Sequence, residues 1–131
     1  MPPTLDCSIM KHVFGTQRMR EVFDSRRLLQ SWLEVWAALA EAEADAGLIP
    51  AEAAKKIRSV AKAELYDLEK IGAGVESGRH ILMPSIRALT EKSGDAGKYV
   101  HWGTTSQDVF DTGLVLQIRD ALVIIEGEVR A

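Results

Sequence analysis

The C-terminal segment is the feature that most restricts how this chain can fold. Within residues 108–131, only the isolated Gly113 and Gly127 interrupt a helical and largely apolar pattern. A helix that is apolar on nearly every side is stable only where other helices or subunits cover it. The pattern is still helical at Ala131, so we expect the segment to be buried in a larger helical bundle or between subunits. The chain is then the N-terminal part of a longer protein or of an obligate oligomer.

Residues 1–107 also carry helix signals and few strand signals, and they predict an N-terminal helical domain in an all-α fold. Asp24 can cap a helix over residues 25–46, and Gly47 can end it in a left-handed conformation. Trp32 and Trp36 lie one turn apart on this helix and are expected in the core or an interface. Further helices are expected at about 50–60, 64–76 and 83–92, with the glycine-rich residues 72–80 fraying into a loop.

Charge and cysteine content exclude several classes of protein. The net charge is -3, which argues against a nucleic-acid partner. The single cysteine, Cys7, cannot form an internal disulfide, and no Cys/His cluster has the spacing of metal ligands. No uncharged apolar run approaches the roughly 18 residues of a membrane span, and the N-terminus lacks the pattern of a signal peptide. We therefore expect a soluble cytoplasmic protein without a membrane partner.

One stretch, residues 101–112, concentrates groups that could do chemistry. It reads His-Trp-Gly-Thr-Thr-Ser-Gln-Asp-Val-Phe-Asp-Thr and places an imidazole, hydroxyls, an amide and two carboxylates in a loop that opens the long helix. Free N–H groups at a helix start, together with the Thr105 and Ser106 hydroxyls, form a natural cradle for a carboxylate. The alternative reading is purely structural, because Thr, Ser and Asp are also ordinary helix caps and His101 can be a partly buried structural residue.

This block resembles the first signature region of the fumarase/aspartase superfamily, most closely its 3-carboxy-cis,cis-muconate cycloisomerase and adenylosuccinate lyase branches. Supporting segments precede it in the family's order: residues 32–35 and 37–40, Gly-Leu-Ile-Pro at 47–50, and His80. Gln107 favours the muconate branch, because the adenylosuccinate branch usually has a second Ser there. Two residues depart from the family pattern, Trp36 in place of Glu and Gly113 in place of Ala. We expect neither to contact the substrate loop.

The resemblance implies a division of labour among the site residues. Thr105 and Ser106 would hold a substrate carboxylate, with Gln107 beside them. Asp108 would orient the loop or a neighbouring cation, since a carboxylate facing the substrate would repel it. His101 and His80 would line the pocket as hydrogen-bond donors or assist proton transfer. For His80, a solvated loop histidine is an equally open reading.

The resemblance also implies a cofactor-independent enzyme with no metal, acting on a small polycarboxylate. Such enzymes stabilise an aci-carboxylate and are homotetramers whose subunits share active sites. Residues 108–131 would begin the long helix of the central helical-bundle domain around which these subunits assemble. The catalytic Ser of the family lies beyond residue 131, so we expect no turnover from these 131 residues alone. The function expected is lactonisation of the muconate cycloisomerase type. The alternatives are a C–N lyase that releases fumarate and a non-catalytic helical oligomerisation module.

Overall fold

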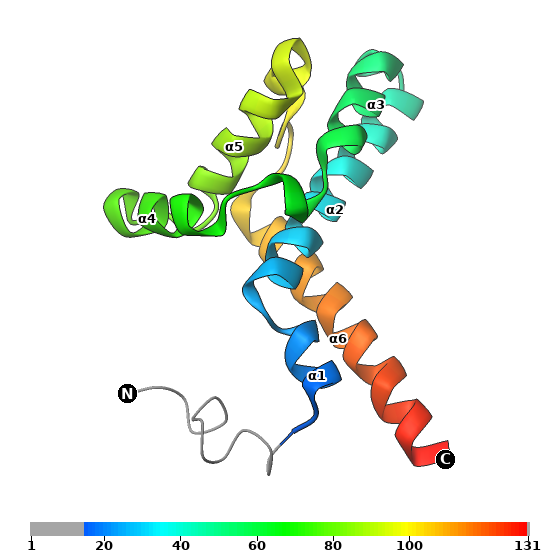
Figure 1. Ribbon diagram of the computed structural model, residues 1–131. Helices are drawn as coiled ribbons and strands as arrows, with labels where there is room; N and C mark the ends of the chain where they lie inside the picture. The colour runs from blue at the N-terminus through cyan, green and yellow to red at the C-terminus, as the bar shows by residue number, and fades with distance from the viewer. Residues whose placement is uncertain (1–14, 131) are drawn as a thin grey trace.

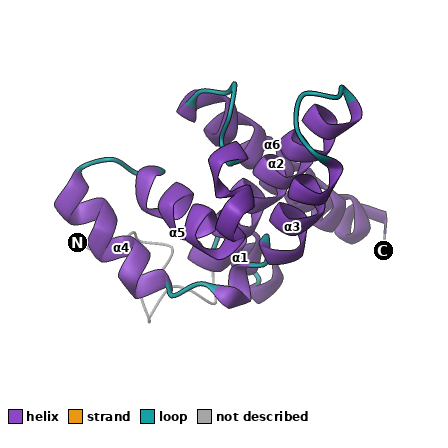
Figure 2. Ribbon diagram, turned by 90° about the horizontal axis from the view of Figure 1, so that it is seen from above, coloured by secondary structure: helices purple, strands orange, loops and turns teal. Residues whose placement is uncertain are grey.

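The computed structural model describes residues 15–130, and Cys7 and the start of the chain lie outside that range. The described residues are helices and connecting turns without a strand, which confirms the all-α fold class. Figures 1 and 2 show the helices crossing at varied angles, with a long C-terminal helix projecting from the rest. In chain order the elements are α1 (Gln17–Val22), α2 (Ser25–Asp45), α3 (Ala51–Val60), the 3-10 turn η2 (Ala63–Leu65), α4 (Leu68–Gly78), α5 (Met83–Ser93), the 3-10 turn η3 (Gly94–Tyr99) and α6 (Ser106–Arg130).

Helix α2 begins and ends as the sequence predicts. The Asp24 carboxylate accepts a hydrogen bond of 2.7 Å from the backbone N–H of Arg27, which satisfies a free donor of the first turn. Past its C-terminal end, Gly47 has a φ of 74°, a left-handed conformation that costs glycine little. The expected helix over residues 25–46 is therefore confirmed to within one residue.

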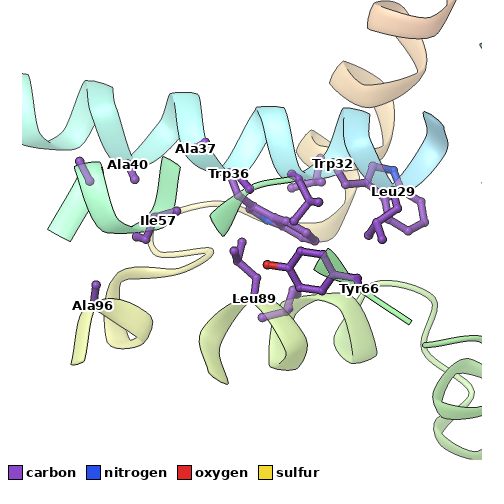
Figure 3. Close-up of a cluster of buried hydrophobic side chains, with 14 of the residues drawn as sticks. Leu29, Trp32, Trp36, Ala37, Ala40, Ile57, Tyr66, Leu89 and Ala96 are labelled. Carbon is purple, nitrogen blue, oxygen red and sulfur yellow. The ribbon is translucent and has the colours of Figure 1, made fainter. Parts of the chain in front are cut away.

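The core lies where α2 packs against α3, α5 and the connections between them (Figure 3). Trp36, Ile57 and Leu89 are almost completely buried there. Trp32, one turn before Trp36, is also buried and meets the Phe110 ring edge-on, with the ring centroids 5.5 Å apart. The expectation that both tryptophans belong to the core is confirmed.

The segment between α3 and α5 differs from its prediction in two ways. The expected helix over residues 64–76 is divided, because the Tyr66 side chain turns into the core and donates to the Val60 carbonyl at 2.8 Å. The expected loop over residues 72–80 is wrong, because α4 continues to Gly78. Packing explains its glycines in part: a Cβ on Gly74 would lie 3.0 Å from Pro84 of α5, so the close approach of these helices favours a glycine.

Helix α6 begins at Ser106, two residues before the predicted start, and packs along α2 (Figure 1). Arg27 forms an ion pair with Asp120, which ties the two helices together. The buried Gln117 donates to the Val22 carbonyl at 2.7 Å and so fixes the end of α1. Only the side of α6 that faces these helices is buried.

The other sides of α6 carry large apolar side chains that the described residues leave exposed. Leu122 is 58% exposed and Val129 is 80% exposed. As the sequence predicted, the preceding helices are too few to cover this helix. None of the helices within residues 15–130 has the length and apolarity needed to span a membrane. The exposed apolar residues of α6 are Leu114, Val115, Ile118, Leu122, Val123, Ile125 and Val129.

Candidate active site

The polar block singled out in the sequence forms the turn between η3 and α6 and the first turn of α6. The Asp108 carboxylate accepts from the backbone N–H of Thr105 and from the Thr104 hydroxyl, both at 3.0 Å. This is the helix-to-loop half of a capping box, in which an acidic side chain in the first turn satisfies the N–H just before the helix. The Asp108 carboxylate is therefore engaged by two donors of the loop itself.

Those two hydrogen bonds also set the ionisation of Asp108. The Thr105 N–H and the Thr104 hydroxyl lower the pKa of Asp108, and the nearby His101 lowers it further. The carboxylate is thus ionised near neutral pH, at the positive end of the α6 dipole. A substrate carboxylate beside it would be repelled, so a carboxylate bound at this turn would lie closer to the Thr105 and Ser106 hydroxyls than to Asp108.

The hydroxyls of Thr105 and Ser106 lie in this same turn. Among the residues 15–130, neither hydroxyl is engaged in a hydrogen bond, and Thr105 is exposed. The N–H groups of the first turn of α6 have no carbonyl of their own helix to pair with. Hydroxyls and free N–H groups at a helix start can together bind one carboxylate.

Gln107 is also exposed, but it is turned along α6 instead of toward the hydroxyls. Its side-chain amide donates to the Asp111 carboxylate at 2.7 Å, one turn further along the helix. This contact uses the side-chain nitrogen of Gln107, and the side-chain oxygen has no hydrogen-bond partner among the described residues. Its expected part in substrate binding stays a prediction.

His101 begins the loop and is held by the core. Its backbone has a φ of 60°, unusual for a residue with a side chain, and its Nδ1 accepts from the Trp36 indole N–H at 2.9 Å. Burial lowers the pKa of His101, the charge of His80 lowers it further, and Asp108 raises it. His101 is therefore neutral over a wider pH range than a free histidine.

His80 lies in the connection between α4 and α5 and is exposed. Its Nδ1 accepts from the backbone N–H of Met83 at 3.2 Å, at the first residue of α5. His80 is close enough to His101 for its charge to act on that ring, although 20 residues separate them. The expected part of His80 in lining the pocket stays a prediction.

Two residues near the loop were misjudged or missed from sequence. The expectation that Trp36 stays clear of the loop is wrong, since its indole is hydrogen-bonded to His101. Glu43 of α2 also lies beside the loop, and no sequence pattern indicated it. A Cβ on Gly103 would lie 3.7 Å from its Oε1. Burial raises the pKa of Glu43, and its Oε2 has no hydrogen-bond partner among the described residues. A single buried glutamate near the end of a helix gives no signal in a sequence.

Gly113, the second residue that departs from the family pattern, lies two turns beyond the loop and packs against Trp32 of α2. A Cβ there would be 2.8 Å from Trp32 Cδ1.

No group of three or more His, Cys, Asp or Glu side chains that could hold a metal occurs within residues 15–130. The candidate site in the described residues comprises hydroxyls and N–H groups at the start of α6 and the imidazoles of His80 and His101.

Comparison with known proteins assigns the family. A family model described as "Lyase" matches residues 12–130, nearly the whole chain. The chain belongs to this lyase family, the fumarase/aspartase superfamily. It corresponds to the N-terminal part of that superfamily's proteins.

Two relatives of this lyase-family chain have different activities. N-acetyl-S-(2-succino)cysteine lyase of Enterococcus italicus is 45% identical over 121 residues, which are 92% of this chain and 27% of that protein. Adenylosuccinate lyase of Methanothermobacter thermautotrophicus is 40% identical over 116 residues, 88% of this chain and 26% of that protein.

A solved structure also resembles it, that of 3-carboxy-cis,cis-muconate lactonizing enzyme from Pseudomonas putida. The TM-score is 0.86 at 41% identity, covering 91% of this chain and 28% of that one. The chain thus spans a little over a quarter of the relatives it matches.

Proposed function

We propose that this chain supplies one wall of the active site of a lyase or cycloisomerase that acts beside a substrate carboxylate. The observation that carries the proposal is the turn at Thr105 and Ser106. Within residues 15–130 its hydroxyls make no hydrogen bond, and the adjacent carboxylate of Asp108 accepts from donors of the loop itself. Such a turn can bind a carboxylate and stabilise the charge that grows on it as an aci-carboxylate forms.

Within that class, we propose lactonisation of the 3-carboxy-cis,cis-muconate cycloisomerase type. In that reaction a carboxylate oxygen adds to a carbon–carbon double bond and the adjacent carbon takes up a proton. Gln107 and the likeness to the Pseudomonas putida enzyme support this choice. The substrate would be a small polycarboxylate, and no cofactor is required by the chemistry of the residues described.

A second candidate is release of fumarate from a succinyl adduct. The 45% identity with N-acetyl-S-(2-succino)cysteine lyase favours a C–S bond as the one broken, and the 40% identity with adenylosuccinate lyase favours C–N. All these reactions share the carbanion beside a carboxylate, so the Thr105–Ser106 turn serves each of them equally. The leaving group must be recognised by residues outside this wall. The third candidate is a non-catalytic oligomerisation module. Its helices would mediate assembly, and the Thr105–Ser106 turn would have no chemical role.

The apolar sides of α6 support assembly with other helices. We propose that they pack in a bundle with further copies, in a homotetramer whose active sites combine residues from several subunits. On this proposal, residues 1–131 alone hold too few catalytic groups for turnover, and the active protein is the intact, cytoplasmic assembly that carries them.

The test is Ser106→Ala in the intact protein that carries this chain. An enzyme that uses Ser106 to bind the reacting carboxylate should lose activity by a factor of about 10² to 10³. The unfolding midpoint should change little, because the Ser106 hydroxyl makes no hydrogen bond to the described residues. Ser25→Ala is the matched control: it also replaces the first residue of a helix, α2, but far from the loop in sequence. Equal activity in both variants would contradict the proposal, and it would favour the non-catalytic reading.

A further inference from the structure

The contact between Trp36 and His101 determines which nitrogen of the histidine carries the proton. The indole N–H lies 2.9 Å from Nδ1 of His101. An indole nitrogen can only donate a hydrogen bond, so Nδ1 must be the acceptor and cannot itself be protonated. In the neutral ring the proton is then on Nε2, and the ring can only donate from that side.

The contact is held by the core. Trp36 is 1% exposed and is fixed among Leu33, Ile57 and Leu89, so its indole cannot turn away at low cost. The two rings meet edge-on, at 86°, with their centroids 6.0 Å apart. The His101 backbone adopts a left-handed conformation with a φ of 60° to bring its ring there. Figure 3 shows the Trp36 ring within the labelled core residues.

We propose that Trp36 is a positioning residue that keeps His101 as a neutral Nε2–H donor, so that His101 binds charge on the substrate without transferring a proton. This inference rests on the proposed function and narrows it. Of the two roles that the sequence left open for His101, donor or proton carrier, it selects the first. To act as a base, Nε2 would have to release its proton to Nδ1, which would break the bond to Trp36.

The charged groups around His101 act in both directions. His80, in the α4–α5 connection, disfavours protonation of His101, and Asp108, at the start of α6, favours it. Glu43, on α2, lies beside Gly103 in the same loop. Burial together with His80 outweighs Asp108, so the pKa of His101 lies below its ordinary value. The electrostatics therefore agree with the hydrogen bond in keeping the ring neutral.

The experiment measures the proton affinity of His101 without a substrate. Exchange of the imidazole C2 hydrogen for deuterium, followed by peptide mass spectrometry at a series of pH values, titrates each histidine separately in the intact protein. In Trp36→Phe, which lacks the donor, the proton affinity of His101 should rise about threefold or more. The matched control is Trp32→Phe, because Trp32 Nε1 has no partner among the described residues. That variant should leave the titration of His101 unchanged.

A second variant separates the lost hydrogen bond from a change in packing. Benzothienylalanine at position 36 keeps the outline of the indole and replaces its N–H by sulfur, so folding is preserved. It should shift His101 as Trp36→Phe does. An unchanged His101 titration with benzothienylalanine, or an equal shift in Trp32→Phe, would overturn the inference.

Turnover distinguishes this inference from the proposed function. With a substrate in hand, Trp36→Phe should lower kcat/KM where His101 is neutral, because the ring can then carry its proton on Nδ1 instead of Nε2. The loss should shrink at lower pH, where His101 is charged and Nε2 is protonated again. A wild-type protein without turnover would count against the proposed function and leave the titration result standing. A Trp36→Phe enzyme with a wild-type profile would overturn the role of Trp36 and leave the function standing.

Discussion

Two glycines of α6 should respond to the same substitution in opposite directions. At Gly113 an added Cβ would lie 2.8 Å from Trp32 Cδ1 and 3.3 Å from Ser31 Oγ, whereas at Gly127 no atom of residues 15–130 would lie within 4 Å of it. Carbon atoms pack best at about 3.5–4.0 Å, so the first contact requires Trp32 to move. Trp32 is 6% exposed and rests against Phe110, and it has little room to do so.

The expected magnitude follows from two opposing effects. Replacing Gly by Ala within a helix stabilises it by up to about 1 kcal/mol, and this gain applies at both positions. Overpacking a buried contact costs about 1–3 kcal/mol, and this cost applies only at position 113. Gly127→Ala should therefore stabilise the protein slightly. Gly113→Ala should be less stable than Gly127→Ala by about 1–3 kcal/mol.

Urea unfolding followed by circular dichroism measures both free energies, and their difference cancels the helix propensity. A Trp32→Leu background tests the cause, because removing the ring edge should make the two substitutions equivalent. Equal effects of the two alanines in the wild-type background would refute the close packing of α6 on α2. A difference that persists in the Trp32→Leu background would refute the assignment of the clash to Trp32.

Three further effects follow from contacts in the described residues. Asp24→Ala should lower the free energy of unfolding by about 1 kcal/mol through loss of the α2 cap, and an unchanged urea midpoint would contradict the cap. Burial raises the pKa of Tyr66 to about 12, so the folded state holds this proton more tightly than the unfolded state, where the pKa is about 10. Stability should fall as the pH rises from about 10 to 12, and Tyr66→Phe should lose this part of the pH dependence. A double-mutant cycle with Arg27→Met and Asp120→Asn should give a coupling of about 0.5–1 kcal/mol that weakens in high salt, and zero coupling would show that the pair does not tie α2 to α6.

Local patterns predicted the helices that have clear start and stop signals. Asp24 and Gly47 marked α2 because capping and left-handed turns depend on a few adjacent residues. The six residues of α1 gave too short a pattern, and its end is fixed by Gln117, which is 95 residues away from Val22. The glycines of α4 suggested a loop, whereas one of them, Gly74, packs against Pro84, a contact that the sequence does not display.

The candidate site also contains features that local sequence patterns predict and features that depend on distant contacts. The turn at Thr105, Ser106 and Asp108 was predictable because its hydrogen bonds join residues three and four apart. The Trp36–His101 bond joins residues 65 apart, and Trp36 itself departs from the family pattern, so nothing local indicated the contact. The roles of His80 and Gln107 remain predictions, since the substrate and the other walls of the site decide them.

Product analysis with the intact protein that carries this chain tests the central claim most directly. The assay offers 3-carboxy-cis,cis-muconate, N-acetyl-S-(2-succino)cysteine and adenylosuccinate separately, and it follows lactone or fumarate by chromatography. The proposed function predicts lactone from the muconate, and fumarate from either adduct would establish the second candidate instead. A folded, assembled protein that converts none of the three would contradict the claim that the Thr105–Ser106 turn belongs to an active site of this kind.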